Sequence, residues 1–298
     1  MKLSKSLPLI ALCAVAYAPT AASAAPTIKS YFEFKKPKMI TIPGDLSLDS
    51  GGASAPVSNV SSTYTLGFEG ISQYGGASFG RNFIPPDTMG AVGRTQYFET
   101  SNGAYAVFDK YTGQRLSLVS DVAFWNSVGQ AGANGDSRVM YNAAAGRWIA
   151  ISFGASTADI QIAISDTDDA LGSWQSTIFT GFAGGVADYP TLAMDTNAVY
   201  IGTNNFTSSF QGTTLNVIPL NSLFGNGAPS VTGMKQFSTA FPGTFEDRGF
   251  ALQGVNSTTA GSTGKVLAAS LFNYDSLGFT VNNLTSTVTN LSESKSRI

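Results

Sequence analysis

Residues 135–154, GDSRVMYNAAAGRWIAISFG, begin with an acidic residue and continue as two short apolar alternations joined by a glycine-containing turn. The same order recurs at residues 86–103, PDTMGAVGRTQYFETSNG, and at residues 187–205, ADYPTLAMDTNAVYIGTNN. Short alternations of this kind are typical of β-strands, and a Gly or Asn turn between two of them predicts a hairpin. The chain therefore repeats one antiparallel β-unit.

An acidic residue opens each predicted unit. These residues are Asp87, Asp136, Asp188 and Asp247, at intervals of 49, 52 and 59 residues. In the second unit, strands are predicted at residues 138–143, 147–152, 160–165 and 174–180. Four antiparallel strands in about 50 residues is the size of a β-propeller blade.

We therefore predict an all-β fold, a β-propeller of four or five four-stranded blades. Residues 64–72 are expected to add a strand that closes the ring; otherwise the chain is a shortened form of a longer propeller. The alternative is a β-sandwich of unrelated hairpins. A sandwich gives no reason for an acidic residue to recur at the same point of each unit.

The first residues have the pattern of a secretory signal peptide. Two lysines precede an apolar run from Leu7 to Ala18, and Ala22-Ser23-Ala24 supplies the small residues of a cleavage site. We expect cleavage near Ala24 and a secreted product, extracellular or periplasmic. The apolar run is too short to span a membrane, and no later stretch is long enough.

The mature chain is expected to have two parts. Residues 25–62 are rich in Ser, Gly and Asp without an apolar period, which predicts a linker or arm. Residues 63–298 carry the repeats and form the predicted propeller domain.

Composition excludes several classes of function. The chain has no histidine, and its one cysteine, Cys13, lies in the predicted signal peptide. Disulfides, Cys/His zinc sites and Ser-His-Asp catalysis are therefore excluded from the mature chain. Cleavage removes two lysines and leaves 15 basic against 19 acidic side chains, a net charge of −4. A nucleic-acid partner is not expected from this balance.

Residues 83–113, 134–154 and 187–206 resemble secreted bacterial proteins, many of them uncharacterised, with a sialidase-like β-propeller. TDDALGSW (residues 167–174) is similar to the Asp-box of that fold, S/T-x-D-x-G-x-T-W, but has Leu171 where the pattern has Gly. The resemblance implies a structural turn between the third and fourth strands of a blade, stabilised by the Asp and Thr side chains and by a packed Trp. It implies no catalytic role for this motif.

In a propeller, the connections that precede each first strand share one face with the loops between second and third strands. The repeated Asp side chains are therefore expected to gather there with residues of those loops and with their own sequence neighbours. These additional residues are Asn102, Asn204, Asn205, Asn273 and Tyr274, with Arg138, Tyr189 and Arg248 beside the repeated Asp residues.

Three interpretations of this predicted face stay open. A repeated Asp can be a structural cap that bonds the backbone of the neighbouring blade. A ring of carboxylates and amides also suits Ca²⁺, which prefers oxygen ligands. Aromatic rings beside amides and carboxylates suit a carbohydrate.

Two hypotheses for function follow. The first is a secreted, non-catalytic module that binds carbohydrate or a cell-surface ligand through this face. The alternative is a sialidase-like glycoside hydrolase whose candidate catalytic residues are Asp136, Asp188, Asp247, Arg138 and Arg248. A pair of separated carboxyl groups beside an arginine would favour the enzyme. Widely spread carboxylates, each bonded to backbone, would favour the binding module or a plain scaffold.

Overall fold

The computed structural model describes residues 66–72, 78–80, 83–132, 135–238, 251–261, 264–269, 275–282 and 290–297. The chain divides into Met1–Thr63 and Tyr64–Ile298, and every described residue belongs to the second unit. The predicted signal peptide and the whole of the predicted linker therefore lie outside the described residues.

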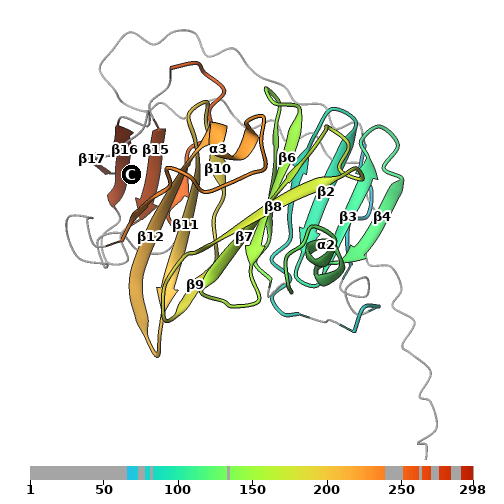
Figure 1. The fold of residues 1–298 in the computed structure, drawn as a ribbon, viewed down its shortest axis with the longest axis horizontal. Coiled ribbons are helices and arrows are strands. Elements are labelled where there is room, and N and C mark those ends of the chain that lie inside the picture. Colours follow the sequence, from blue (N-terminus) through green and yellow to red (C-terminus); the bar gives the residue numbers. More distant parts are fainter. Residues whose placement is uncertain are drawn as a thin grey trace, which may run out of the picture. The chain divides into compact units, whose positions relative to one another are not determined.

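The strands form four antiparallel sheets that follow one another along the chain (Figure 1). The first sheet contains β1 (Met89–Val92), β2 (Gln96–Ser101), β3 (Ala104–Asp109) and β4 (Arg115–Ser120). The second contains β5 (Arg138–Asn142), β6 (Arg147–Phe153), β7 (Asp159–Ser165) and β8 (Trp174–Thr180). The third contains β9 (Val186–Asp188), β10 (Ala193–Met194), β11 (Ala198–Phe206), β12 (Phe210–Pro219) and β13 (Lys235–Phe237). The fourth contains β14 (Gln253–Gly254), β15 (Gly264–Ala269), β16 (Asp275–Asn282) and β17 (Asn290–Arg297).

This arrangement confirms the all-β prediction and the four-stranded antiparallel unit. The first, second and fourth sheets each have four strands in simple sequence order, and neighbouring sheets touch through β1 and β5, β7 and β9, and β11 and β14. The fold is β-propeller-like. Neither described helix has the length and apolar composition that a membrane crossing needs.

The third sheet departs from the simple pattern because its first strand is broken. β9 and β10 both pair with β11, through Asp188 with Asn204 and through Ala193 with Tyr200. Pro190 lies in the interruption. Proline has no N–H to donate to a ladder, so it separates the two pairing segments.

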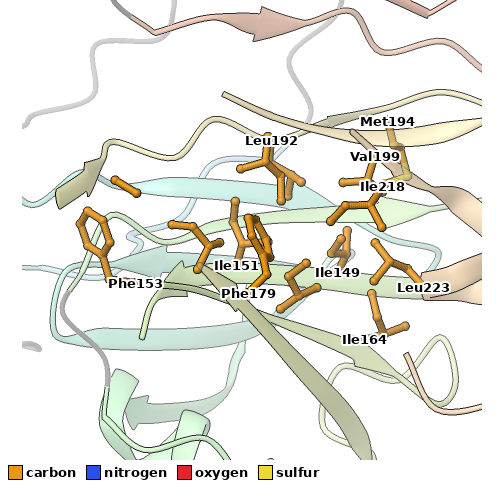
Figure 2. Close-up of a cluster of buried hydrophobic side chains, with 14 residues drawn as sticks. Ile149, Ile151, Phe153, Ile164, Phe179, Leu192, Met194, Val199, Ile218 and Leu223 are labelled. Atoms are coloured by element: carbon orange, nitrogen blue, oxygen red, sulfur yellow. The ribbon is translucent and has the colours of Figure 1, made fainter. Parts of the chain in front are cut away.

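The largest apolar cluster fills the space between the second and third sheets (Figure 2). Ile149 and Ile151 of β6 lie beside Leu192, Val199 and other residues of the third sheet. Six of the seven residues of β6 are buried. Its apolar run is nearly continuous because both faces of the strand are covered.

A second cluster joins the first and second sheets. Trp148 and Phe98 are fully buried and meet edge to face, with ring centroids 6.1 Å apart. Gly93 permits this approach, because a Cβ at that position would lie 2.4 Å from Cζ2 of Trp148. The glycine at the turn after β1 is therefore a packing requirement.

Two short helices connect strands. α2 (Asp121–Ser127) begins after Ser120, whose hydroxyl accepts from Ala123 N at 3.1 Å as an N-cap. Trp125 of this helix donates from Nε1 to the Tyr105 hydroxyl at 2.7 Å, inside the core. α3 (Leu220–Phe224) follows β12 and buries Leu223.

Residues 66–72 form no strand, so the predicted closing strand is not found in this part of the segment. They lie against the first sheet instead. The Phe68 ring contacts Phe108 at 5.1 Å between centroids, and Ile71 N donates to Oε2 of Glu99 at 3.1 Å.

Candidate functional site

A backbone feature recurs shortly before β1, β5, β10 and β14. Asp87, Asp136, Tyr189 and Ala251 have φ angles of 42°, 54°, 49° and 55°. Non-glycine residues seldom adopt this left-handed conformation, and Asp tolerates it better than most. We call the side of the sheets that carries these four residues the top face.

This backbone repeat places the unit boundary more accurately than the acidic residues did. Asp87 and Asp136 occupy equivalent positions in the first two sheets. In the third sheet the equivalent residue is Tyr189, so Asp188 lies one position earlier. In the fourth it is Ala251. Asp247, which was expected to fill that position, lies outside the described residues, as do Arg248, Asn273 and Tyr274.

A chain of hydrogen bonds joins the top faces of three sheets. Asn102, between β2 and β3, donates from Nδ2 to Oδ2 of Asp87 at 2.9 Å. Its Oδ1 accepts from Asp136 N at 2.7 Å, across the boundary to the second sheet. Asp136 Oδ2 in turn accepts from Tyr189 N at 3.2 Å, across the boundary to the third. Each polar side chain thus caps the left-handed residue of the next sheet.

The same device links the third sheet to the fourth. Asn204, near the end of β11, accepts at Oδ1 from Ala251 N at 2.8 Å. Its neighbour Asn205 is 2% exposed and uses its amide within the sheet, donating to Thr214 Oγ1 at 2.7 Å and accepting from Thr203 Oγ1 at 3.2 Å. Of these two predicted binding residues, Asn204 serves as a cap and Asn205 is enclosed.

The top-face carboxyl groups influence one another strongly. Burial, a hydrogen bond to the Asp87 carboxyl and the charges of Asp87 and Asp188 raise the pKa of Asp136 to about 6. The Tyr189 N–H opposes this increase. Burial also raises the pKa of Asp188, with the Tyr189 N–H again opposing and the Asp87 charge adding to the increase.

Arg138 lies on the same face and joins the second sheet to the third. Its Nε donates to Pro190 O at 3.1 Å, and its guanidinium carbon lies 4.4 Å from the centre of the Tyr189 ring. This is a cation–π contact. No described residue accepts a hydrogen bond from its terminal Nη atoms. The top face therefore offers partly exposed carboxyl groups, one amide, one guanidinium and one aromatic ring.

The described residues contain no group of three or more His, Cys, Asp or Glu side chains placed to hold a metal ion. The three top-face carboxyl groups interact with one another through their charges and with the Tyr189 backbone N–H. Oxygen atoms of Asp87 and Asp136 already accept hydrogen bonds from Asn102 Nδ2 and Tyr189 N.

The Thr167–Trp174 turn lies between β7 and β8, where the sequence pattern predicted it. Asp169 Oδ1 accepts from Leu171 N at 2.9 Å, and Thr167 Oγ1 accepts from Asp169 N at 3.2 Å. Trp174 packs edge to face on Phe98, with centroids 5.9 Å apart. The turn is a structural element, and it lies at the ends of the strands opposite the top face.

Sequence analysis missed the partner of this turn. Gln96 of the first sheet donates from Nε2 to Asp169 Oδ1 at 2.8 Å and accepts at Oε1 from Ala170 N at 2.7 Å. More than seventy residues separate the two partners. A lone glutamine at the start of a predicted strand carries no signal of such a contact.

A second repeat was also missed, at the opposite ends of the first strands. Asn142 accepts at Oδ1 from Ala144 N and Ala145 N, both at 3.1 Å. Asp195 accepts at Oδ1 from Asn197 N at 2.7 Å and from Ala198 N at 2.9 Å. Each lies six residues after its left-handed residue and caps the turn to the second strand. We call this side of the sheets the bottom face.

Comparisons with known proteins find no matching family model and no matching curated protein. Among solved structures, a Synechocystis apocarotenoid oxygenase mutant is 12% identical to this chain, with a TM-score of 0.42. The match covers 70% of this chain and 48% of the oxygenase chain. An exo-β-1,3-galactanase from Phanerochaete chrysosporium with galactose is 11% identical to this chain, with a TM-score of 0.41. The match covers 74% of this chain and 51% of the galactanase chain. A GH43 β-1,3-galactosidase is 14% identical to this chain, with a TM-score of 0.38. The match covers 69% of this chain and 44% of the galactosidase chain. This chain thus spans about half the length of each, and likeness at this level says nothing about activity.

Proposed function

We propose that the chain is a secreted protein with a sialidase-like β-propeller that binds a carbohydrate ligand through its top face without catalysing a reaction. The observation that carries the proposal is the hydrogen-bonded chain from Asp87 through Asn102 and Asp136 to Tyr189. It joins three sheets and holds polar groups at fixed positions on one surface. Preorganised groups of this kind bind a ligand with little loss of side-chain entropy.

The chemistry of the face fits a polyhydroxylated ligand. Asp87, Asp136 and Asp188 are partly exposed and accept hydrogen bonds, and the Arg138 Nη atoms donate them. The Tyr189 ring supplies an aromatic surface. Sugars present both hydroxyl groups and C–H faces, so they can use both kinds of contact.

The hydrogen bonds of the carboxyl groups favour binding over hydrolysis. Glycoside hydrolases need two carboxyl groups that are free to act as acid and as nucleophile or base. The Asp87 carboxyl group instead accepts from Asn102 Nδ2 at 2.9 Å. Asp136 is also held by the Tyr189 backbone N–H, as expected for a group with a structural role.

Binding can be tested on a glycan array with the purified chain, with and without EDTA. Asp136→Asn keeps an oxygen for the Tyr189 N–H and removes the carboxylate, so array signal should fall while the fold is retained. Asp166→Asn is the matched control, because Asp166 is exposed and its side chain accepts, among the hydrogen bonds described, only from Gln175 Nε2, at 2.7 Å. Equal signal from the wild type and Asp136→Asn would overturn the proposal.

A glycoside hydrolase is the second candidate, supported by the raised pKa of Asp136 beside Arg138. A carboxyl group that titrates near neutral pH suits a general acid. Hydrolysis of a fluorogenic glycoside that is lost in both Asp136→Asn and Asp188→Asn, and kept in Asp166→Asn, would favour the enzyme. Array signal without hydrolysis would favour the binding module.

Secretion is a separate part of the proposal. It rests on the charged, apolar and small-residue segments of residues 1–24. Mass spectrometry of the exported protein should find an N-terminus at Ala25. An exported protein that keeps residues 1–24 would contradict it.

A further inference from the structure

A cavity of about 360 Å³ opens on the bottom face, where the first strands of the second, third and fourth sheets end. Residues from all three sheets line it, among them Met140, Asn142, Met194, Asp195 and Asn256. Small-molecule sites typically occupy about 300–1,000 Å³ and combine an apolar lining with a few fixed polar groups. The cavity lies at the opposite strand ends from the Asp87–Asp136 site.

The orientation of the Asn142 amide is determined by its hydrogen bonds. Its side chain receives two backbone N–H donors, from Ala144 and Ala145, so the receiving atom is the oxygen. The NH₂ group must therefore lie on the other side of the amide. No described residue accepts a hydrogen bond from that nitrogen.

Asn256 repeats this arrangement from the fourth sheet. Its Oδ1 accepts from Met194 N at 3.0 Å, which again assigns the oxygen and leaves the NH₂ group as a donor without a described acceptor. Two amide donors from different sheets therefore line one cavity. A ligand there must supply hydrogen-bond acceptors.

Asp195 limits the charge of that ligand. Its Oδ1 is used by Asn197 N and Ala198 N, and its Oδ2 accepts from the Tyr200 hydroxyl at 2.8 Å. Asp195 is 4% exposed, and no Lys or Arg of the described part of the chain lines the cavity. A buried carboxylate without a neighbouring cation repels an anion, so the ligand should carry no negative charge.

The apolar part of the lining is formed by Met140, Met194 and Leu220. Met194 lies at the edge of the cluster between the second and third sheets (Figure 2). Methionine side chains adapt to irregular apolar surfaces. The cavity therefore combines an apolar surface with two fixed donors.

We propose that this cavity is a second ligand site that takes one neutral pyranose ring. The C–H face of the sugar lies on the methionines, and its oxygens accept from Asn142 Nδ2 and Asn256 Nδ2. This site is independent of the proposed top-face function. Either site can be present without the other.

Methionine methyl NMR can distinguish the two sites in one spectrum. In the purified chain labelled with [methyl-¹³C]methionine, Met140 and Met194 report on the cavity, and Met89, two residues after Asp87, reports on the top face. The probes are the methyl glycosides of glucose, galactose, mannose and N-acetylglucosamine at millimolar concentration, with N-acetylneuraminic acid as an anionic comparison. At least one neutral glycoside should shift Met140 and Met194, and the anion should not.

Two substitutions test the donors without removing the backbone caps. Asn142→Asp and Asn256→Asp keep the oxygen that accepts from backbone and replace the donor with an acceptor. Each should weaken binding by about tenfold, the effect of losing one hydrogen bond of about 1.4 kcal/mol. Asn126→Asp, in α2, is the matched control and should bind as the wild type does.

Three outcomes would overturn the second site. They are shifts of Met89 alone, no shift of Met140 and Met194 with any neutral glycoside, and unchanged binding in both Asn→Asp variants. The first of these supports the top-face proposal, so the two proposals fail separately.

Discussion

The backbone N–H of Tyr189 donates a hydrogen bond of 3.2 Å to Oδ2 of Asp136, so a carboxyl group at the start of the second sheet holds the residue that follows β9 in the third. Asn102 and Asn204 make the same kind of bond at the neighbouring boundaries. The sheets are therefore joined by directional bonds on the top face as well as by apolar packing between them.

Asp136→Asn is expected to change how stability depends on pH. The pKa of Asp136 is raised from 3.8 to about 6, so the folded state favours its neutral form. The stabilisation from this group is complete below about pH 4 and is lost as the pH rises to about 6. Asparagine is neutral throughout and can still accept from Tyr189 N. The variant should therefore have a higher Tm than the wild type at pH 7.

The measurement is thermal unfolding by circular dichroism at pH 5 and pH 7. The difference in Tm between variant and wild type should be larger at pH 7 than at pH 5, and Asp166→Asn should show no such trend. A variant that is less stable than the wild type at pH 7 would show that the Asp136 charge stabilises the fold.

Gly93→Ala should destabilise the boundary between the first and second sheets. The new Cβ would lie 2.4 Å from a ring carbon of Trp148, which is fully buried and has no room to move. Overpacking of this kind costs about 1–3 kcal/mol. Gly227→Ala, where a Cβ would meet nothing within 4 Å, is the matched control. Urea denaturation should give a lower midpoint for Gly93→Ala alone.

Gln96→Ala should weaken the attachment of the Thr167–Trp174 turn to the first sheet. It removes the donor to Asp169 and leaves the buried N–H of Ala170 without its acceptor. A buried donor without a partner costs about 1–3 kcal/mol. Gln175→Ala, which removes an exposed contact with Asp166, should cost under about 1 kcal/mol. Equal losses of unfolding free energy in the two variants would show that the Gln96 contact is not a stabilising one.

Ala251→Gly should stabilise the start of the fourth sheet. Ala251 has a φ of 55°, a conformation that costs an L-residue about 1–2 kcal/mol and costs glycine almost nothing. The greater entropy of an unfolded chain with glycine offsets part of the gain. Ala145→Gly, in an exposed turn without positive φ, should have no such gain. Hydrogen exchange of β14 and β15 amides should slow in Ala251→Gly, and faster exchange would contradict the assignment of strain.

Strand positions in the second sheet could be predicted closely from sequence, because each strand has a short apolar alternation bounded by turn residues. The same reasoning located the turn after β7. It did not identify the left-handed residue of the third sheet. Asp188 has the expected residue type, but the left-handed backbone belongs to Tyr189.

The grouping of Asp87, Asn102 and Asp136 on one face was expected from the repeat, and a cap on the neighbouring sheet was one of the interpretations given for the repeated Asp. The capping role of Asn102 was not expected. Which oxygen accepts which N–H depends on the positions of two sheets, and no local pattern encodes that. The bottom-face cavity was missed because Asn142, Asp195 and Asn256 differ in type or register, so their common position at the strand ends is not visible as a motif.

By itself, the sequence determined the β-class, the four-stranded unit and the local turns, because these follow from the period of apolar residues and from residues that cap the backbone nearby. Only the tertiary structure decided which carboxyl group has a raised pKa, which asparagine is enclosed and where a cavity opens. Those properties depend on burial and on hydrogen bonds between residues roughly 30 to 60 positions apart, which arise only when neighbouring sheets pack together.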